Sequence, residues 1–219
     1  CGLVGSEMCI RDRHIMKNKI LLQILLLPLF IFSQQVSFTE FDLDNGLHVI
    51  MHQDNSAPVV ITSVMYDVGG KDRAEGRTGF AHFFEHLLFE GSENIGRGEF
   101  MKIIPANGGT FNAYTSNDET YYYEIFPSNK LELGLWMESE RMLHPVIDQV
   151  GVDTQNEVVK EEKRQRYDSP YGKLFKVLGE NLFKVHPYKD ENIGKMEDLD
   201  AATLEAVSYT HLRAHETAM

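Results

Sequence analysis

The sequence predicts an α+β fold, in which strands and helices are mixed along the chain. β-branched or alternating segments that follow glycine-containing turn signals predict the strands, and apolar segments with helical spacing predict the helices. These elements do not follow a regular βαβ order, so a doubly wound parallel sheet is not expected. The 219 residues include 33 acidic and 21 basic side chains, for a net charge of −12. That charge argues against binding to nucleic acid.

The first half of the domain contains two predicted strands and two predicted helices. Residues 47–52 follow an Asn-Gly turn signal, and residues 59–68 are rich in β-branched side chains and end at a pair of glycines. The apolar segment 79–89 predicts a buried helix. A second, shorter helix is predicted over 99–104, where Pro105 stops it.

The second half begins with two more predicted strands. Residues 110–115 alternate in polarity after a Gly-Gly pair, and residues 120–126 form the next strand. Ser128 caps a predicted helix over 128–143, which ends before a proline. Helical spacing then continues over 154–183, with a possible break at residues 169–170, which are Ser-Pro. No internal repeat is visible.

The two ends of the chain are related at the level of codons. Val207 to Glu216 can be written in codons whose reverse complement encodes Leu3 to Asp12. An inverted repeat at both ends of a reading frame resembles a translated sequencing adapter, and such segments are excluded from fold reasoning. We therefore expect residues 1–15 and 207–219 to be non-native and to have no role in packing. Both cysteines lie in the first segment, so no disulfide framework is predicted.

Residues 16–34 have the pattern of a secretory signal peptide. A basic start precedes the apolar run 20–32, which is too short to span a bilayer as a helix. We therefore expect a secreted or periplasmic protein without a stable membrane span. Residues 35–206 form the remaining domain, which breaks off in a segment that resembles the start of a helix. The domain is expected to be incomplete at this end.

The residues that carry chemistry lie in the pentapeptide HFFEH. His82 and His86 are four residues apart, so on a helix they lie on one face and can bind one Zn²⁺. Glu85 lies near the same face and can accept a proton from water that the metal activates. A lone histidine on an apolar helix is more often a core residue. A catalytic zinc site would also need a third protein ligand and an open position for water.

The surroundings of the pentapeptide resemble the inverted-zinc-motif peptidases, the pitrilysin or M16 family. The residues that carry the likeness are GFAHFFEHLLFEGS at 79–92, GGTFNAYTSNDETYYYEI at 108–125 and EVVKEEKRQR at 157–166. The resemblance extends over about residues 38–206. It implies the N-terminal domain of that family, with a mixed, mainly antiparallel sheet packed with helices.

The resemblance also implies the third metal ligand. In the family it is a glutamate about 75 residues after the second histidine, and Glu162 lies 76 residues after His86. Glu161 is the alternative, but the two side chains project about 100° apart on a helix, so only one can face the metal. A solvated acidic face is the other interpretation of this segment. Some relatives carry a second acid seven residues earlier, where this chain has Gln155, and Glu157 is the candidate to substitute for it.

In the family, the strand that matches 110–115 pairs with the backbone of the substrate. The resemblance therefore implies that Asn112 and Ala113 hold a peptide near the zinc. Asn112 can also be read as an ordinary polar residue of an edge strand.

These observations predict a zinc-dependent endopeptidase that cleaves peptides or unfolded polypeptides. One Zn²⁺ per chain would be held by His82, His86 and Glu162, and Glu85 would act as general base. The resemblance implies that a second homologous half or subunit completes the site, so this chain alone is expected to be weak or inactive. The alternative is a non-catalytic partner or scaffold subunit of the same family. A purely structural zinc site would usually have a fourth protein ligand, often Cys, and residues 16–206 contain none.

Overall fold

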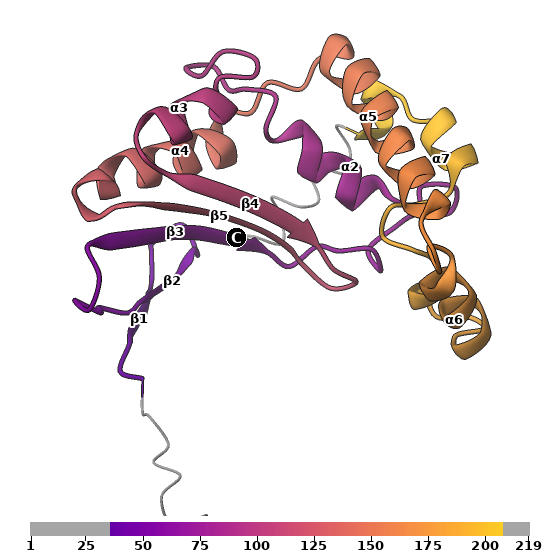
Figure 1. Ribbon diagram of the computed structural model, residues 1–219, viewed down its shortest axis with the longest axis horizontal. Coiled ribbons are helices and arrows are strands. Elements are labelled where there is room, and N and C mark those ends of the chain that lie inside the picture. The colour runs from indigo at the N-terminus through magenta and orange to yellow at the C-terminus, as the bar shows by residue number, and fades with distance from the viewer. Residues whose placement is uncertain (1–35, 208–219) are drawn as a thin grey trace, which may run out of the picture. The chain divides into compact units, whose positions relative to one another are not determined.

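The computed structural model describes residues 36–207 (Figure 1). The predicted signal peptide, the first adapter segment and residues 208–219 lie outside the described residues, so these assignments stay predictions. Val207 is the exception, because its side chain is only 1% exposed and belongs to the hydrophobic core. The expected lack of a packing role for 207–219 is therefore wrong at this residue.

The chain divides into two compact units. The described part of the smaller unit comprises residues 36–40 and Ile50–Gln53, and that of the larger one comprises Phe41–Val49 and residues 54–207. β1 (Thr39–Asp42) and β2 (His48–Met51) form a two-stranded sheet. The sequence predicted β2 but not β1, since the residues of β1 are exposed throughout and show no inward-facing apolar alternation.

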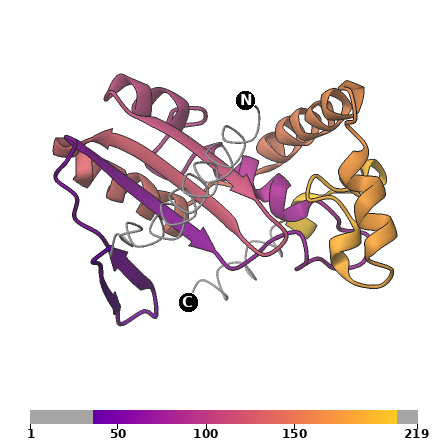
Figure 2. The ribbon, with the colours of Figure 1, turned by 60° about the horizontal axis from the view of Figure 1, so that its bottom comes forward.

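The main sheet consists of β3 (Val59–Tyr66), β4 (Thr110–Thr115) and β5 (Thr120–Pro127). Their order is β3-β5-β4, and both pairings are antiparallel (Figure 2). The register places Tyr122 of β5 opposite Val64 of β3 and Ala113 of β4. Among the described residues, β4 is therefore an edge strand of this sheet.

One face of the sheet carries the core. Along β5, the side chains of Tyr122, Glu124 and Phe126 are buried, and the residues between them are only partly covered. Three helices lie on the covered face in Figure 1: α2 (Phe80–Leu87), α3 (Phe100–Ala106) and α4 (Leu131–Leu143). Pro105 lies inside α3, so the expected stop before this residue is wrong. A proline is tolerated there because the helix is ending, and its ring interrupts only the last turn.

The long helix α5 (Gln149–Asp168) packs against α2. Asp148 caps its start, since Oδ1 accepts a hydrogen bond from the Gly151 amide at 2.8 Å. The helix ends before Ser169-Pro170, which confirms the predicted break, and α6 (Leu174–Leu182) follows. The remaining elements are the 3₁₀ turns η2 (Ser128–Lys130) and η3 (Pro187–Lys189) and the short helix α7 (Met196–Asp200). Within residues 36–207 we find no helix with the length and apolarity needed to cross a bilayer.

A buried charge cluster supports the end of α2. The Arg141 guanidinium bonds to Glu124 at 2.8 Å and lies 3.3 Å from both carboxylate oxygens of Glu138. It also donates to the carbonyl of Leu88, the C-cap residue of α2, at 3.1 Å. This cluster ties the strand β5 and the helix α4 to the helix that carries the HFFEH segment.

Candidate metal centre

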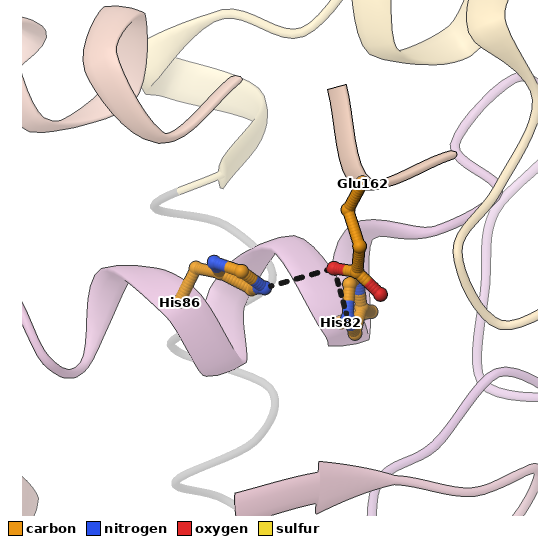
Figure 3. Close-up of side chains that lie close together, drawn as sticks. All are labelled: His82, His86 and Glu162. Carbon is orange, nitrogen blue, oxygen red and sulfur yellow. Dashed lines mark ion pairs between the residues drawn. The ribbon is translucent and has the colours of Figure 1, made fainter. Parts of the chain in front are cut away.

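Three side chains from two helices converge on one point. His82 and His86 project from α2, and Glu162 projects from α5 towards them (Figure 3). Glu162 Oε2 lies 3.5 Å from Nε2 of each histidine, and all three ligand atoms lie within 4.8 Å of one another. The packing of α2 against α5 therefore assembles a set of two imidazole nitrogens and one carboxylate oxygen.

The burial of the three side chains differs. The side chain of His82 is 12% exposed, that of His86 23% and that of Glu162 37%. The apolar side chains around the rest of α2, led by Phe83 and Leu87, are almost fully buried and fix the rotation of the helix. The two histidines therefore face α5, and the site opens to solvent on the side of Glu162.

The arrangement fits a zinc ion. Ligands at about 2.1 Å in tetrahedral geometry would lie about 3.4 Å apart, and the glutamate oxygen is 3.5 Å from each histidine nitrogen. Two imidazoles and one carboxylate are also a donor set that catalytic zinc sites use, with a further position left for water or substrate. The three residues can thus bind the metal with little rearrangement.

The two histidines have pKa values shifted in opposite directions. Burial, followed by the charge of His86, lowers the pKa of His82 to about 4, so its ring is neutral at neutral pH. Burial also acts to lower the pKa of His86, but the hydrogen bond with Glu162 and the Glu85 charge offset it, and this pKa is raised. The same hydrogen bond holds the pKa of Glu162 below its usual value. Zinc binding would therefore compete with protonation of His86.

Glu85 lies on the inner side of α2, where it is 8% exposed. Thr115, the last residue of β4, donates a hydrogen bond from Oγ1 to Glu85 Oε2 at 2.6 Å. Burial raises the pKa of the Glu85 carboxyl, although the Thr115 bond opposes this. A carboxylate with a raised pKa is a stronger proton acceptor, and one of its oxygens is held in place by the strand.

The sequence matches the model of the insulinase family, peptidase family M16, over residues 48–195. The chain belongs to this family. Among curated relatives, the zinc protease PqqE of Helicobacter pylori is 34% identical over 171 residues, which is 77% of this chain and 38% of the relative. Human cytochrome b-c1 complex subunit 1 is 27% identical over 188 residues, 84% of this chain and 38% of the relative.

Solved structures agree with the assignment to M16. The crystal structure of a protease from Helicobacter pylori has a TM-score of 0.79 and 32% identity, and the match covers 83% of this chain and 44% of that one. Pitrilysin, with a TM-score of 0.73 and 21% identity, shares the fold over 84% of this chain and 20% of its own. The predicted α+β fold of an M16 N-terminal domain is confirmed. The chain covers 38% of the length of each of these two curated relatives, PqqE and cytochrome b-c1 complex subunit 1.

The structure shows different surroundings for the candidate acids on α5. Glu162 reaches the histidines, and its other oxygen lies 3.2 Å from Arg166. Glu161 is exposed and lies 3.3 Å from Arg164. Glu157 is exposed as well and pairs with Lys160, so it does not substitute for an acid at position 155.

Two polar residues that support the HFFEH pentapeptide were not predicted: Glu90, which acts through Gln155, and Thr115. The Oε1 atom of Gln155 lies 3.3 Å from Nδ1 of His86. The Nε2 atom of Gln155 donates a hydrogen bond to Oε1 of Glu90 at 2.5 Å. Glu90 lies in the turn beyond Leu87, the last residue of α2, so helical spacing from His86 does not reveal its position. Thr115, the partner of Glu85, is the second missed residue. Only the pairing of β4 with β5 brings Thr115 to α2, so no local sequence signal reveals it.

Asn112 and Ala113 lie on the edge strand β4, as their predicted role requires. Asn112 is exposed, and its Oδ1 accepts a hydrogen bond from the Ala113 amide at 3.0 Å. A peptide that bonds to this amide would have to displace the Asn112 side chain. Ala113 itself packs against the core beside α2. Their contact with substrate stays a prediction.

Proposed function

We propose that this chain carries the catalytic zinc site of an M16 endopeptidase that cleaves peptides or unfolded polypeptides. The observation that carries the proposal is the convergence of His82, His86 and Glu162, with Glu85 on the same helix. Membership of M16 and the likeness to zinc proteases support this proposal.

Three side chains would bind the metal, and Glu85 would transfer protons. When bound, zinc supplies a Lewis acid for the scissile carbonyl and for the attacking water. His82 and His86 would hold the ion through Nε2, and Glu162 would hold it through Oε2. Glu85 would take the proton from water and later deliver it to the leaving amine. Because Thr115 occupies Glu85 Oε2, the proton would be carried on Oε1.

The substrate would bind as an additional strand on the free edge of β4. Backbone hydrogen bonds then give affinity with little dependence on sequence, and Asn112 and Ala113 are the nearest candidates to supply them. β4 ends at Thr115, which touches Glu85, so a peptide along this edge would lead towards the metal ligands.

A second homologous half or subunit would complete the enzyme. The greater length of the relatives supports this proposal, because the chain covers only 38% of the PqqE zinc protease. The predicted signal peptide at 16–34 supports export to the periplasm or the exterior. Fractionation of cells that express the intact reading frame would test the location. Recovery only in the cytoplasm would contradict it.

A non-catalytic subunit is the second candidate function. The likeness to cytochrome b-c1 complex subunit 1, which is named as a subunit, favours it. The complete set of two histidines, Glu85 and Glu162 favours the peptidase instead, because a scaffold has no need of a general base beside a metal group.

The variant Glu85→Gln tests the proposal. It should be made in the uninterrupted reading frame recovered from the source DNA, and zinc content and cleavage of an unstructured peptide should be measured on the same samples. Glutamine keeps the shape and the hydrogen bond with Thr115, so zinc should be retained. It cannot accept the proton, so the cleavage rate should fall about 10²–10⁴-fold.

The variant His82→Ala serves as the comparison, since it should lose zinc and cleavage together. Near-normal cleavage by Glu85→Gln would remove Glu85 from the mechanism. No cleavage of a varied peptide library by zinc-loaded wild type would favour the subunit function.

A further inference from the structure

The second ring nitrogen of His86 lies at the end of a chain of polar contacts. His86 Nδ1 is 3.3 Å from Gln155 Oε1, and Gln155 Nε2 donates to Glu90 Oε1 at 2.5 Å. The neighbouring His82 differs, because its buried Nδ1 has no hydrogen-bond partner among the residues that the structure describes. Of the two histidines, only His86 therefore has a polar contact at Nδ1 among the described residues.

The chemistry of the groups sets the direction of each hydrogen bond. A carboxylate only accepts, so Glu90 turns the amide nitrogen of Gln155 towards itself. The amide oxygen then faces His86, where it can only accept. Gln155 therefore favours a proton on Nδ1, and once zinc takes the place of any proton that Nε2 shares with Glu162, the ring keeps its lone pair on Nε2. Nε2 is the nitrogen that faces Glu162 Oε2 at 3.5 Å.

Glu90 is itself held in place. It is 8% exposed, and its other oxygen forms an ion pair with Arg97 Nη1. Arg97 Nη2 bonds to both oxygens of Asp148, at 2.7 and 2.8 Å. Asp148 caps α5, the helix that carries Glu162. The chain of contacts therefore runs from a histidine on α2 to the start of the helix that bears the carboxylate.

We propose that Gln155 and Glu90 act together as positioning residues that set the ring tautomer of His86 and so prepare Nε2 to bind zinc. An amide alone could present either end to the ring, and the carboxylate behind it removes this ambiguity. A residue that fixes a metal-binding histidine in this way usually affects metal affinity strongly. The proposal rests on the proposed zinc site, but its first test requires neither zinc nor activity.

The first test measures the tautomer directly. Long-range ¹H–¹⁵N NMR of the metal-free Glu162→Ala variant of the 219-residue chain, in which this carboxylate no longer competes for the proton on Nε2, should show Nδ1 protonated and Nε2 unprotonated at a pH where the His86 ring is neutral. A ring protonated on Nε2 would overturn the proposal, whether or not the protein binds zinc. Failure of the zinc site alone would leave the predicted tautomer unchanged, so the two failures are distinguishable.

The second test uses Glu90→Gln in the 219-residue chain with Glu162 intact. The new amide can donate or accept, so Gln155 is free to flip and the tautomer of His86 should become mixed. Competition with a chelator should show zinc affinity about 10–100-fold weaker. Glu93→Gln is the matched control, because this exposed side chain loses the same charge but lies 3.6 Å from His144 and outside the chain of contacts. Equal affinity in the two variants would overturn the proposal.

A swap separates positioning from a structural role. Gln155→Glu alone would place two carboxylates at the 2.5 Å contact with Glu90, and zinc affinity should fall. The double variant Glu90→Gln with Gln155→Glu restores one acceptor facing His86 and one donor behind it. It should recover most of the lost affinity and the Nδ1-protonated ring. A double variant no better than the weaker single one would contradict the proposal.

Discussion

Arg141 holds two carboxylates in the core of the domain, and one positive charge cannot balance both. Its guanidinium contacts Glu124 and Glu138 and lies 4.5–4.8 Å from the centres of three aromatic rings. Burial, followed by the neighbouring Glu138, raises the pKa of Glu124 to about 9. The cluster therefore retains a proton at neutral pH that the unfolded chain would release.

This proton makes stability depend on pH. Glu124 ionises near 4.5 when unfolded and near 9 when folded, so the folded state binds more protons between these values. Its contribution to stability is fully present below about pH 4.5, declines as pH rises and is lost above about pH 9. Thermal unfolding of the 219-residue chain should thus show a melting temperature that falls from pH 6 to pH 9. Glu124→Gln should flatten this decline.

The control for this pH effect is Glu132→Gln, which removes an exposed carboxylate from α4, the helix that carries Glu138 and Arg141. Its pH profile should match that of wild type. The same slope in all three proteins would show that Glu124 is not the group responsible.

At the scale of residues, helical spacing alone predicted that His82 and His86 share a face and that Glu85 lies near it. The resemblance to M16 predicted Glu162, and the structure brings that residue rather than Glu161 to the histidines. Glu90 and Thr115 were not predicted. Their contacts depend on the packing of α2 against α5 and β4, which a single sequence does not reveal.

At the scale of elements, the start of α2 depends on two glycines that touch. Gly79 has φ = 83°, which favours glycine. A Cβ atom there would lie 2.6 Å from the Cα of Gly194. Thr78, just before it, accepts a hydrogen bond from the Lys195 amide at 2.8 Å. The segment before α7 therefore fixes the end of the helix nearest His82.

Gly79→Ala should accordingly destabilise the domain strongly. Gly76→Ala is the matched control, since Gly76 also has a positive φ of 73° but no atom within 4 Å of the added Cβ. The clash should cost about 1–3 kcal/mol more at Gly79 than backbone strain alone costs at Gly76. Urea unfolding monitored by circular dichroism measures both. Equal losses would mean that the contact with Gly194 relaxes freely.

The elements that the sequence predicted well have strong local signals. Strands β3 and β4 have β-branched or alternating residues near glycine pairs, and the break after α5 follows from Ser169-Pro170. The start of α5 was predicted at residue 154 but lies at Gln149, because capping by Asp148 was not recognised. β1 has no burial pattern to detect.

At the scale of the whole molecule, the proposed metal would join two helices distant in sequence. His82 and His86 belong to α2, and Glu162 lies 76 residues beyond His86 on α5. Because a folded site binds the ion and an unfolded chain does not hold it in this geometry, zinc should also raise the stability of the fold. We therefore expect one zinc ion to bind between these helices.

Zinc binding by Glu162→Gln and Glu161→Gln tests this claim most directly. The two adjacent residues lose the same charge, but only Glu162 lies 3.5 Å from both histidines. Zinc content and chelator competition should show one ion per wild-type chain and unchanged affinity in Glu161→Gln. Glu162→Gln should lose more than the roughly 10–100-fold expected for a residue outside the coordination sphere. Undiminished zinc affinity in Glu162→Gln, or a loss confined to Glu161→Gln, would contradict the proposed metal centre.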